Sequence, residues 1–352
     1  MDNQKIAIIG HFGGKEKFTD GQTVKTLRLY EELTRMTDWK ILKVDTYYKG
    51  KNPIKLLLYT LIALLRVKNV IVLLSGNGMK IYFPLLSFCA KHFKIKVYHD
   101  VIGGNLANYI EKYPKYRKYL NSFCGNWVET QMLKDELELK GLKNVEIIPN
   151  FRRLNSVKKD EIVSMKYGEP YKFCTFSRVM KEKGIEDAIY AINSINKKYN
   201  RIICLLDIYG PIEKKYKDRF LNIMDETDSS ISYKGEVSSE LAVDIIKNYY
   251  SLLFPTKWDG ESNAGTITES FFAGVPVIAT DWRCNYEMIT SGYNGMLYPS
   301  EYAKSLEEAI EWLLDNSENI YNLKKNCIVS SEKYYPDKIV TKIINIIERE
   351  NV

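Results

Sequence analysis

The chain has 352 residues, which is enough for two domains of ordinary size, because a domain contains about 100–200 residues. Its hydrophobic content of 45% and charged content of 27% are typical of globular proteins, and its net charge is +7. The six cysteines lie 30 or more residues apart, which excludes a Cys-x-x-Cys site and, with only three histidines, argues against structural zinc.

The two halves of the chain differ in charge. Residues 1–150 contain 24 Lys and Arg against 14 Asp and Glu, a net charge of +10, whereas residues 151–352 contain 27 against 30, a net charge of −3. A basic half is suited to contact with phosphates, nucleic acid or an anionic membrane. A plain solvated surface rich in lysine has the same composition, so charge alone leaves both interpretations open.

In chain order, short apolar segments typical of buried strands come first, at 5–12, 40–46, 69–74, 95–100, 126–130 and 145–150. Helical patterns separate them. In the first, Leu29, Leu33 and Met36 are spaced i, i+4, i+7, and Asp20 is a suitable N-cap. Strands that alternate with helices predict a parallel sheet covered on both faces.

The N-terminus carries an acidic residue and runs directly into a strand, so no signal peptide is expected and the protein is expected in the cytoplasm. The most apolar run, 56–65, has ten residues, whereas a helix needs about 20 to cross a bilayer. The surrounding segment 51–68 fits two interpretations: a packed helix of the first domain, or a helix that contacts a membrane surface.

The pattern of strands restarts after a polar, aperiodic segment at 152–170, which is typical of a linker. Strands are predicted at 172–179, 203–210, 231–237, 251–256 and 275–281, and helices at 185–196 and 302–314. We therefore predict two α/β domains, 1–160 and 161–335, each a Rossmann-like, doubly wound parallel sheet, facing a ligand cleft. A C-terminal helix at 336–352 could cross back to the first domain.

The segment "DGESNAGTITESFFAGVPVIATD", residues 259–281, follows a predicted strand and places Glu261 and Glu269 eight positions apart. A glycosidase pair holds its carboxyl groups about 5–9.5 Å apart, whereas eight residues of helix span about 12 Å. Separate hydroxyl groups of one extended ligand suit the two glutamates better. The start of the following helix suits phosphate, so the ligand that fits is a nucleotide sugar.

This segment resembles the E-x7-E motif of the retaining GT-B glycosyltransferases of the GT4 family, which includes bacterial capsular and exopolysaccharide enzymes. Other elements follow in the family's order over nearly the whole chain: "GHFGGKEKFTDGQTVKT", "SRVMKEKGIEDAI", "IYG", "YKGEV" and "GVPVIATD". The sequence departs from the commoner family form after Glu261, where it has Ser262-Asn263-Ala264. This departure leaves the donor sugar open.

The resemblance implies a catalytic set of Arg178, Lys183, Glu261 and His99. Arg178 and Lys183 would bind the donor diphosphate, whose negative charge grows as the sugar departs. Glu261 would contact the transferred sugar, and His99 falls where family members have a histidine near the sugar. A core histidine is the other interpretation of His99, and Asp100 beside it is a possible cap of the next helix.

The remaining implied residues would bind the donor. Glu269 would accept hydrogen bonds from the ribose. Gly13 and Gly14 of the first loop would let the backbone approach the donor phosphate closely. The backbone of Asn263, Ala264, Gly265 and Thr266 would hold the sugar and the phosphates. Gly210 and Val237 would lie near the base.

The implied activity is hexose transfer with retention from a UDP- or GDP-linked sugar to a glycan or lipid-linked saccharide, with no metal and no other cofactor. The first domain would bind the acceptor and the second the donor, in bacterial cell-surface polysaccharide synthesis at the inner face of the membrane. Segment 111–123 interleaves Lys and Arg with Tyr. We interpret it as a patch that contacts headgroups of an anionic membrane, not as a nucleic-acid site, since no nucleic-acid module surrounds it.

Two other functions remain open on the same fold. One is a nucleotide-sugar epimerase, which would need further acid–base carboxylates and histidines. The other is a non-catalytic subunit that binds a nucleotide sugar.

Overall fold

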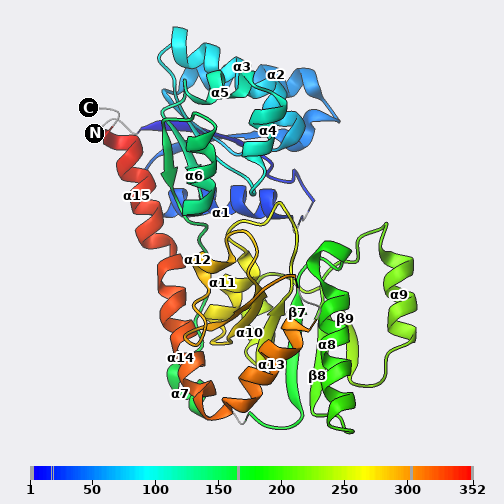
Figure 1. The fold of residues 1–352 in the computed structure, drawn as a ribbon. Helices are drawn as coiled ribbons and strands as arrows, with labels where there is room; N and C mark the ends of the chain where they lie inside the picture. Colours follow the sequence, from blue (N-terminus) through cyan, green and yellow to red (C-terminus); the bar gives the residue numbers. More distant parts are fainter. Residues whose placement is uncertain (1–3, 17, 19, 165–166, 302–303, 350–352) are drawn as a thin grey trace. The chain divides into compact units, whose positions relative to one another are not determined.

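The computed structural model describes residues 4–16, 18, 20–164, 167–301 and 304–349. Lys17 and Thr19 of the predicted first loop, residues 165–166 of the predicted linker, and the predicted helical positions 302–303 and 350–352 lie outside these residues. The chain divides into two compact units (Figure 1). The N-terminal unit contains residues 1–152 and 336–352, and the C-terminal unit contains residues 153–335.

The N-terminal unit is built on a six-stranded parallel sheet with the order β2-β1-β3-β4-β5-β6. The strands are β1 (Lys5–Gly10), β2 (Lys40–Asp45), β3 (Asn69–Val72), β4 (Lys96–Asp100), β5 (Gly125–Val128) and β6 (Val145–Ile147). Every one of the six strands predicted in this half is confirmed. Strands β3 and β5 are buried along their whole length, including the polar Asn69 and Asn126, as expected for a parallel sheet covered on both faces.

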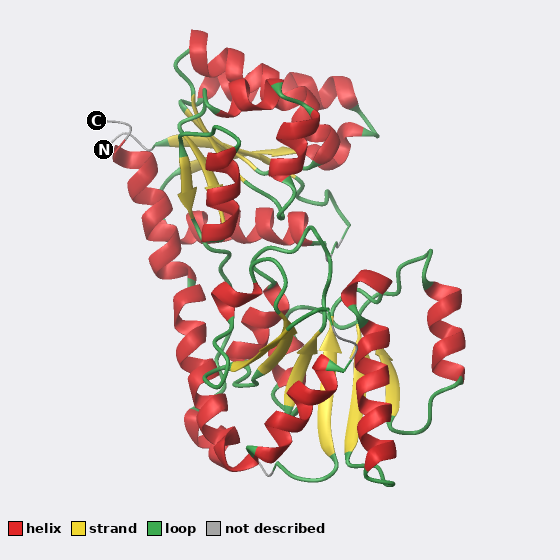
Figure 2. Cartoon of the chain, in the orientation of Figure 1, coloured by secondary structure: helices red, strands yellow, loops and turns green. Residues whose placement is uncertain are grey.

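Helices cover both faces of this sheet, as expected for a doubly wound fold (Figure 2). They are α1 (Gly21–Met36), the 3₁₀ turn η1 (Thr46–Lys49), α2 (Pro53–Arg66), α3 (Gly76–His92), α4 (Leu106–Lys112), α5 (Lys115–Leu120), α6 (Gln131–Leu139) and α15 (Pro336–Arg349). Asp20 caps α1 as predicted, since its side chain accepts hydrogen bonds from the N–H groups of Gln22 and Thr23.

The last helix, α15, packs in the core of the N-terminal unit. Its buried face, with Ile339, Ile343 and Ile347, joins Leu29 and Leu33 of α1 and residues of β1 in one hydrophobic cluster. The side chain of Lys342 also donates a hydrogen bond to the carbonyl of Ile147 at the end of β6, at 2.8 Å. The chain therefore returns to its first unit after completing the second.

The C-terminal unit contains a second six-stranded parallel sheet, with the order β12-β11-β10-β7-β8-β9. The strands are β7 (Tyr171–Phe176), β8 (Cys204–Tyr209), β9 (Ile231–Gly235), β10 (Ser251–Phe254), β11 (Val277–Thr280) and β12 (Gly295–Tyr298). The five strands predicted from the sequence are present. The sixth, β12, was not predicted, because it lies at the edge of the sheet beside β11 and its two middle residues are only partly buried.

The helices of the C-terminal unit are α7 (Lys159–Ser164), η2 (Lys181–Lys183), α8 (Ile185–Lys198), α9 (Lys217–Asp225), α10 (Ala242–Ile246), α11 (Gly265–Phe272), α12 (Asn285–Met288), α13 (Ser305–Asp315), η3 (Ser317–Asn319), α14 (Ile320–Ser331) and η4 (Glu332–Tyr334). Helix α7 lies within the segment predicted as a linker. That prediction is wrong there, because Val157 and Ile162 are buried in the core of this unit. The unit accordingly begins at Arg153, before the predicted boundary at 160.

A buried lysine lies in the core of the C-terminal unit. The side chain of Lys324 on α14 is fully buried, and its Nζ donates a hydrogen bond to the carbonyl of Tyr249 at 2.8 Å. The same nitrogen lies 4.2 Å from the centre of the Tyr167 ring. Burial lowers the pKa of Lys324 from 10.5 to about 7, because the interior disfavours its charged form.

We expect Lys324 to make the stability of this unit depend on pH. Between pH 7 and 10.5 the unfolded chain binds a proton that the native amine releases, so the free energy of unfolding should rise with pH. The slope is at most about 1.4 kcal/mol per pH unit. Urea unfolding from pH 7 to 9 should show this slope in the wild type and lose it in Lys324→Met. Lys325→Met, at the half-exposed neighbouring position, should keep it. Equal slopes in all three proteins would contradict the prediction.

Within the described residues, no helix combines the length and the apolar character that a bilayer crossing requires.

Candidate functional site

The loop after β7 carries both predicted diphosphate-binding cations. Strand β7 ends at Phe176, Arg178 follows in the loop, and Lys183 ends the short turn η2. Gly184 comes next, with φ of +67°, and α8 begins at Ile185. A Cβ atom at Gly184 would lie 2.1 Å from the carbonyl oxygen of Pro255. The loop can therefore approach the end of β10 this closely only because residue 184 is glycine.

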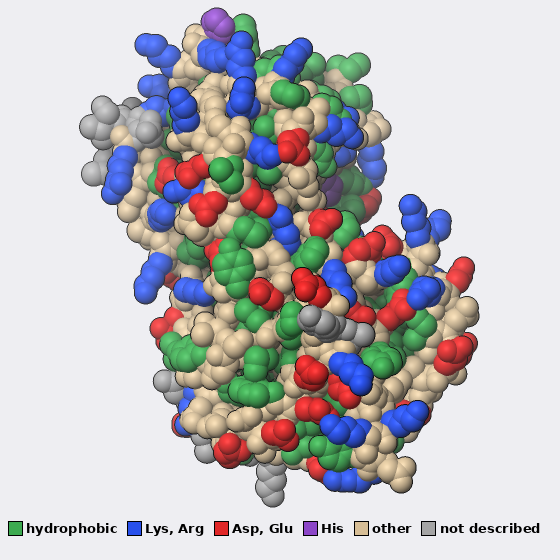
Figure 3. Space-filling model, viewed as in Figure 1, with side chains coloured by type: hydrophobic (Ala, Val, Ile, Leu, Met, Phe, Trp, Pro, Cys, Tyr) green, Lys and Arg blue, Asp and Glu red, His purple; other side chains and the backbone are tan. Residues whose placement is uncertain are grey.

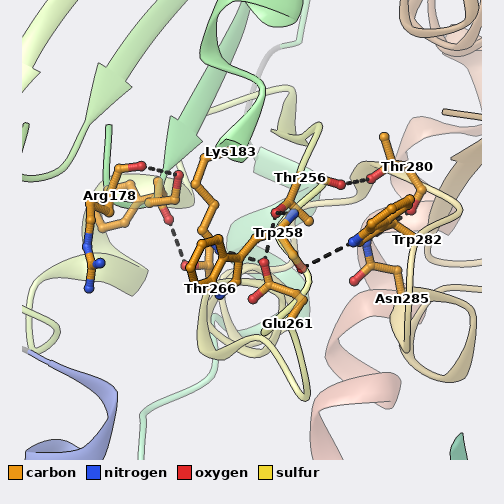
Figure 4. A network of polar contacts seen from close by, with 11 residues as sticks. Arg178, Lys183, Thr256, Trp258, Glu261, Thr266, Thr280, Trp282 and Asn285 are labelled. Atoms are coloured by element: carbon orange, nitrogen blue, oxygen red, sulfur yellow. Dashed lines mark hydrogen bonds and ion pairs between the residues drawn. The ribbon is translucent and has the colours of Figure 1, made fainter. Parts of the chain in front are cut away.

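Lys183 and Glu261 form an ion pair at this edge of the sheet. The Lys183 Nζ lies 2.5 Å from a carboxylate oxygen of Glu261, and the same oxygen accepts a hydrogen bond from the Thr256 hydroxyl at 2.9 Å. The two charged side chains are only 14% and 11% exposed. In Figure 4, Lys183 points toward Glu261 and Thr256. The sequence assigned the two residues to different parts of the donor, whereas the structure brings them into direct contact.

The loop that carries Glu261 is fixed by backbone contacts on both sides. The carbonyl of Trp258 accepts hydrogen bonds from the N–H of Glu261 and from the indole N–H of Trp282, each at 3.1 Å. On the other side, the N–H of Lys257 donates to the carbonyl of Glu182 at 2.7 Å. The position of the Glu261 carboxylate is thus set by strands β7, β10 and β11 together.

Arg178 lies at the same edge but takes no part in this ion pair. Its side chain is exposed, and in Figure 4 the guanidinium points away from Lys183 and Glu261. Its guanidinium forms no hydrogen bond or ion pair with any residue that the structure describes, whereas its backbone carbonyl accepts a hydrogen bond from the Ser177 hydroxyl at 3.3 Å. The site thus combines one cation held by a carboxylate with a second whose charge is unneutralised.

Helix α11 begins beside this cluster. Its N-cap residue is Ala264, which offers no side-chain hydrogen bond to the first turn. The Thr266 hydroxyl donates to the carbonyl of Phe176 at the end of β7, at 2.7 Å, which fixes the start of the helix next to the loop of Arg178. A helix N-terminus without a side-chain cap is suited to an anionic ligand. Asn263 and Glu269, before and within the helix, are both buried.

Gly210 and Val237 follow the neighbouring strands β8 and β9. A Cβ at Gly210 would lie 1.9 Å from the carbonyl oxygen of Ser177, so this glycine lets the end of β8 contact the loop that carries Arg178. The N–H of Gly210 donates to the carbonyl of Gly235 at the end of β9, at 2.9 Å, and Val237 lies two residues further on. The structure therefore brings Gly210 to the edge of the site and places Val237 on the adjoining loop.

Gly13 and Gly14 lie in the N-terminal unit, in the loop after β1, both with positive φ. The carboxylate of Asp45 accepts hydrogen bonds from the N–H groups of Phe12 and Gly14, at 2.9 and 2.8 Å. The N–H of Gly14 thus already donates its hydrogen bond to Asp45, within the same unit. The approach of this loop to a donor phosphate stays a prediction.

His99 is fully buried on β4, with its ring packed edge-on against Phe83 at 5.0 Å between centroids. Burial lowers the pKa of His99 to about 3, so the ring is neutral at physiological pH. This environment is that of a core histidine, the second of the two interpretations that the sequence left open. A contact between His99 and a sugar stays a prediction.

Sequence reasoning missed a buried charge cluster in the N-terminal unit. Lys25 on α1 lies 2.7 Å from a carboxylate oxygen of Asp100 and 2.9 Å from one of Glu129. The prediction that Asp100 caps the next helix is wrong, since α4 begins only at Leu106, after Asn105. Burial raises the pKa of Asp100 to about 6, although Lys25 opposes the shift. The available signal was that both carboxylates lie at the ends of the predicted strands 95–100 and 126–130, which brings them to one edge of a parallel sheet.

In the C-terminal unit, the residues at the carboxyl ends of β7, β8 and β10 can bind an anionic ligand. They supply two cations and a helix N-terminus, which suits a diphosphate, and a buried carboxylate that can accept hydrogen bonds from hydroxyl groups. This edge is where ligands bind in open parallel sheets.

The comparisons with known proteins agree with this chemistry. A family model described as "Glycosyl transferases group 1" matches residues 156–333, just over half of the chain. An uncharacterized glycosyltransferase of Methanocaldococcus jannaschii is 24% identical over 236 residues. That match covers 66% of this chain but only 56% of the relative's length.

Among solved structures, sucrose-phosphate synthase from Thermosynechococcus elongatus superposes with a TM-score of 0.76 at 14% identity, covering 98% of each chain. HepE of Anabaena in complex with UDP also gives a TM-score of 0.76, at 10% identity, covering 98% of this chain and 100% of HepE. At such low sequence identities, the structural similarity establishes that the folds are alike. The prediction of a GT-B fold built from two parallel-sheet domains is confirmed.

Proposed function

Because the chain belongs to the glycosyl transferases group 1 family, we propose that it transfers a glycosyl group from a nucleotide-sugar donor to an acceptor hydroxyl. The observation that carries the proposal is the ion pair of Lys183 and Glu261 beside the unneutralised Arg178 and the uncapped start of α11. These features lie in the same unit as the family match. They offer positive charge to a diphosphate and a carboxylate to sugar hydroxyls.

We propose that transfer retains the configuration at the anomeric carbon. The bond from that carbon to the diphosphate oxygen breaks, and the acceptor oxygen forms a bond on the same face. The acceptor proton passes to the leaving phosphate, so no protein nucleophile is required. Lys183 and Arg178 stabilise the charge that the diphosphate gains, which is the usual electrostatic contribution of such cations. The positive charge of these groups supports the proposal that no metal ion is needed.

The proposed donor carries a hexose on UDP or GDP. UDP is the first choice for a test, because HepE, whose fold this chain shares, has been solved with UDP and with UDP-glucose. A glycan or lipid-linked saccharide is the proposed acceptor, in bacterial cell-surface polysaccharide synthesis. The charge of +10 on residues 1–150 supports contact with an anionic membrane. A location at its inner face stays a prediction.

A thermal-shift screen tests the donor site. The purified protein is heated with UDP, GDP, ADP or dTDP, with and without EDTA. A nucleotide present at 100 times its dissociation constant should stabilise the protein by about 2.7 kcal/mol. We expect one nucleotide to do so with or without EDTA, and Glu269→Gln to weaken its binding about tenfold through the lost ribose contact. Glu240→Gln, an exposed position in the same unit, should bind like the wild type.

Absence of stabilisation by all four nucleotides would refute the proposed donor site. If a nucleotide sugar binds but is converted to its epimer without an acceptor, the epimerase alternative holds instead.

A further inference from the structure

Helix α2 presents an apolar face to solvent as well as an apolar face to the core. The inner face, with Thr60, Ala63 and Leu64, is buried. The outer face consists of side chains spaced i, i+3, i+4, i+7, i+8 and i+11, all exposed: Ile54, Leu57, Leu58, Leu61, Ile62 and Leu65. Ile54 is 74% exposed and Leu65 is 86% exposed. A helix of a globular protein normally turns charged or polar residues to solvent, so this outer stripe has no role in the core.

Helix α3 extends the same surface. The Tyr82 hydroxyl of α3 lies 3.1 Å from the hydroxyl of Thr60, which fixes the two helices side by side (Figure 1). Ile81 and Phe88, about two turns apart on α3, are exposed, and Phe93 follows the end of this helix. We call the exposed apolar side chains of both helices the α2–α3 surface: Ile54, Leu57, Leu58, Tyr59, Leu61, Ile62, Leu65, Ile81, Phe88 and Phe93. Half of the chain's exposed large hydrophobic side chains, among the described residues, lie between 48 and 93.

The charge around the α2–α3 surface is mainly positive, although Lys51, just before α2, pairs with Glu16 at 3.3 Å. The sequence contains no Asp or Glu between Asp45 and Asp100, whereas it contains nine Lys or Arg there: Lys49, Lys51, Lys55, Arg66, Lys68, Lys80, Lys91, Lys94 and Lys96. Helix α5, which packs against α3, adds Lys115, Arg117 and Lys118. In Figure 3, hydrophobic and basic side chains lie side by side over this part of the N-terminal unit.

We propose that the α2–α3 surface inserts into the headgroup region of an anionic lipid bilayer. Monomeric proteins rarely expose a contiguous apolar area of this kind unless another surface covers it. An apolar stripe bordered mainly by cations matches a bilayer, which offers acyl chains beneath a layer of negative headgroups. Helix α2 has 14 residues, or about 21 Å at 1.5 Å per residue, which is shorter than the hydrocarbon core of about 30 Å. The helix therefore lies along the membrane and does not cross it.

This inference rests on the proposed function in one respect: a membrane-bound enzyme would meet a lipid-linked acceptor. The inference also assigns the proposed membrane contact to particular helices. The stretch 111–123, with its interleaved lysines and tyrosines, adjoins the α2–α3 surface through α5 and supplies headgroup contacts at its border. The apolar insertion itself belongs to α2 and α3.

A matched pair of substitutions tests the proposal. Leu65 on α2 and Leu139 at the end of α6 lie in the same unit, and both are 86% exposed. The wild type, Leu65→Glu and Leu139→Glu are floated with vesicles of phosphatidylcholine, with or without one third phosphatidylglycerol. We expect the wild type and Leu139→Glu to float with the anionic vesicles. Leu65→Glu should bind at least about tenfold more weakly, because it places a carboxylate in the apolar stripe. Ile54→Glu should repeat the loss.

Charge variants separate the electrostatic part. Arg66→Gln with Lys68→Gln should weaken binding to the anionic vesicles by about fivefold per residue at low salt and less at high salt. Failure of the wild type to bind anionic vesicles overturns the proposal, as does an equal loss in Leu65→Glu and Leu139→Glu. If light scattering instead shows a dimer that only Leu65→Glu and Ile54→Glu dissociate, and no vesicle binding, a second copy covers the surface and the proposal is also overturned.

Nucleotide stabilisation is measured on the same samples. It reports on the C-terminal unit, so a protein that binds a nucleotide but no vesicle refutes the membrane surface alone. A protein that binds vesicles but no nucleotide refutes the proposed donor site alone. Unchanged melting temperatures of the α2 variants show that they fold.

Discussion

Replacement of Glu261 by Gln is expected to slow glycosyl transfer by about a hundredfold and, at the same time, to tighten the binding of the free nucleoside diphosphate. The loss of transfer follows from the loss of a charged acceptor for sugar hydroxyls in the transition state. The gain in binding follows from the ion pair: Glu261 neutralises Lys183 at 2.5 Å, and an amide would leave that cation for the diphosphate. The gain should be about threefold to tenfold, because removing one member of a largely buried pair leaves the other uncompensated.

Calorimetric titration with the diphosphate and a steady-state transfer assay would measure the two effects. Glu311→Gln is the matched control. Glu311 of α13 also pairs with a lysine at 2.5 Å, Lys198, but on the outer surface of the unit. That variant should change neither quantity. Weaker diphosphate binding in Glu261→Gln would show that Glu261 acts by holding the loop and not by neutralising Lys183.

Gly184→Ala is expected to destabilise the C-terminal unit by about 2–4 kcal/mol and to abolish binding of the donor nucleotide. An alanine at a φ of +67° costs about 1 kcal/mol. The larger part comes from the overlap of its Cβ with the Pro255 carbonyl, 2.1 Å away, which only a shift of the loop can relieve. That shift would move Lys183, the residue directly before it, away from Glu261.

Gly292→Ala separates the two contributions. Gly292 has a φ of +77°, but no atom lies within 4 Å of the position its Cβ would take. This variant should lose only about 1 kcal/mol and keep nucleotide binding. Urea unfolding and the nucleotide thermal shift measure both proteins. Equal destabilisation by the two substitutions would show that the overlap of the new Cβ in Gly184→Ala with the Pro255 carbonyl does not lower the free energy of unfolding.

The sequence predicted the two sheets well, because their strands are buried runs separated by polar turns. It did not predict β12, whose four residues include Gly295 and lie at an edge where burial is incomplete. It also misread 157–164 as linker. The buried apolar residues described there, Val157 and Ile162, are too widely spaced to create a periodic pattern in a polar segment.

The sequence predicted which residues form the candidate site, but it did not predict which of them contact one another. Lys183 and Glu261 are 78 positions apart, and their contact depends on β7 and β10 being neighbours in the sheet, an order that periodicity does not reveal. Two glycines supply another part of the geometry. Gly184 and Gly210 let the backbone pass close to the carbonyls of Pro255 and Ser177, and the sequence alone does not predict these contacts. The Lys25–Asp100–Glu129 cluster depends in the same way on the order of β4 and β5.

The return of α15 to the N-terminal unit affects the order in which the protein folds during synthesis. Ile339, Ile343 and Ile347 fill the core beside α1, yet the ribosome makes them more than 300 residues after the first strand. The C-terminal unit is continuous, so all of its residues have been made before α15 appears. Domains usually fold in the order of synthesis. Here the unit whose synthesis starts first completes its core last, and until then the apolar face that α15 covers stays exposed on the nascent chain.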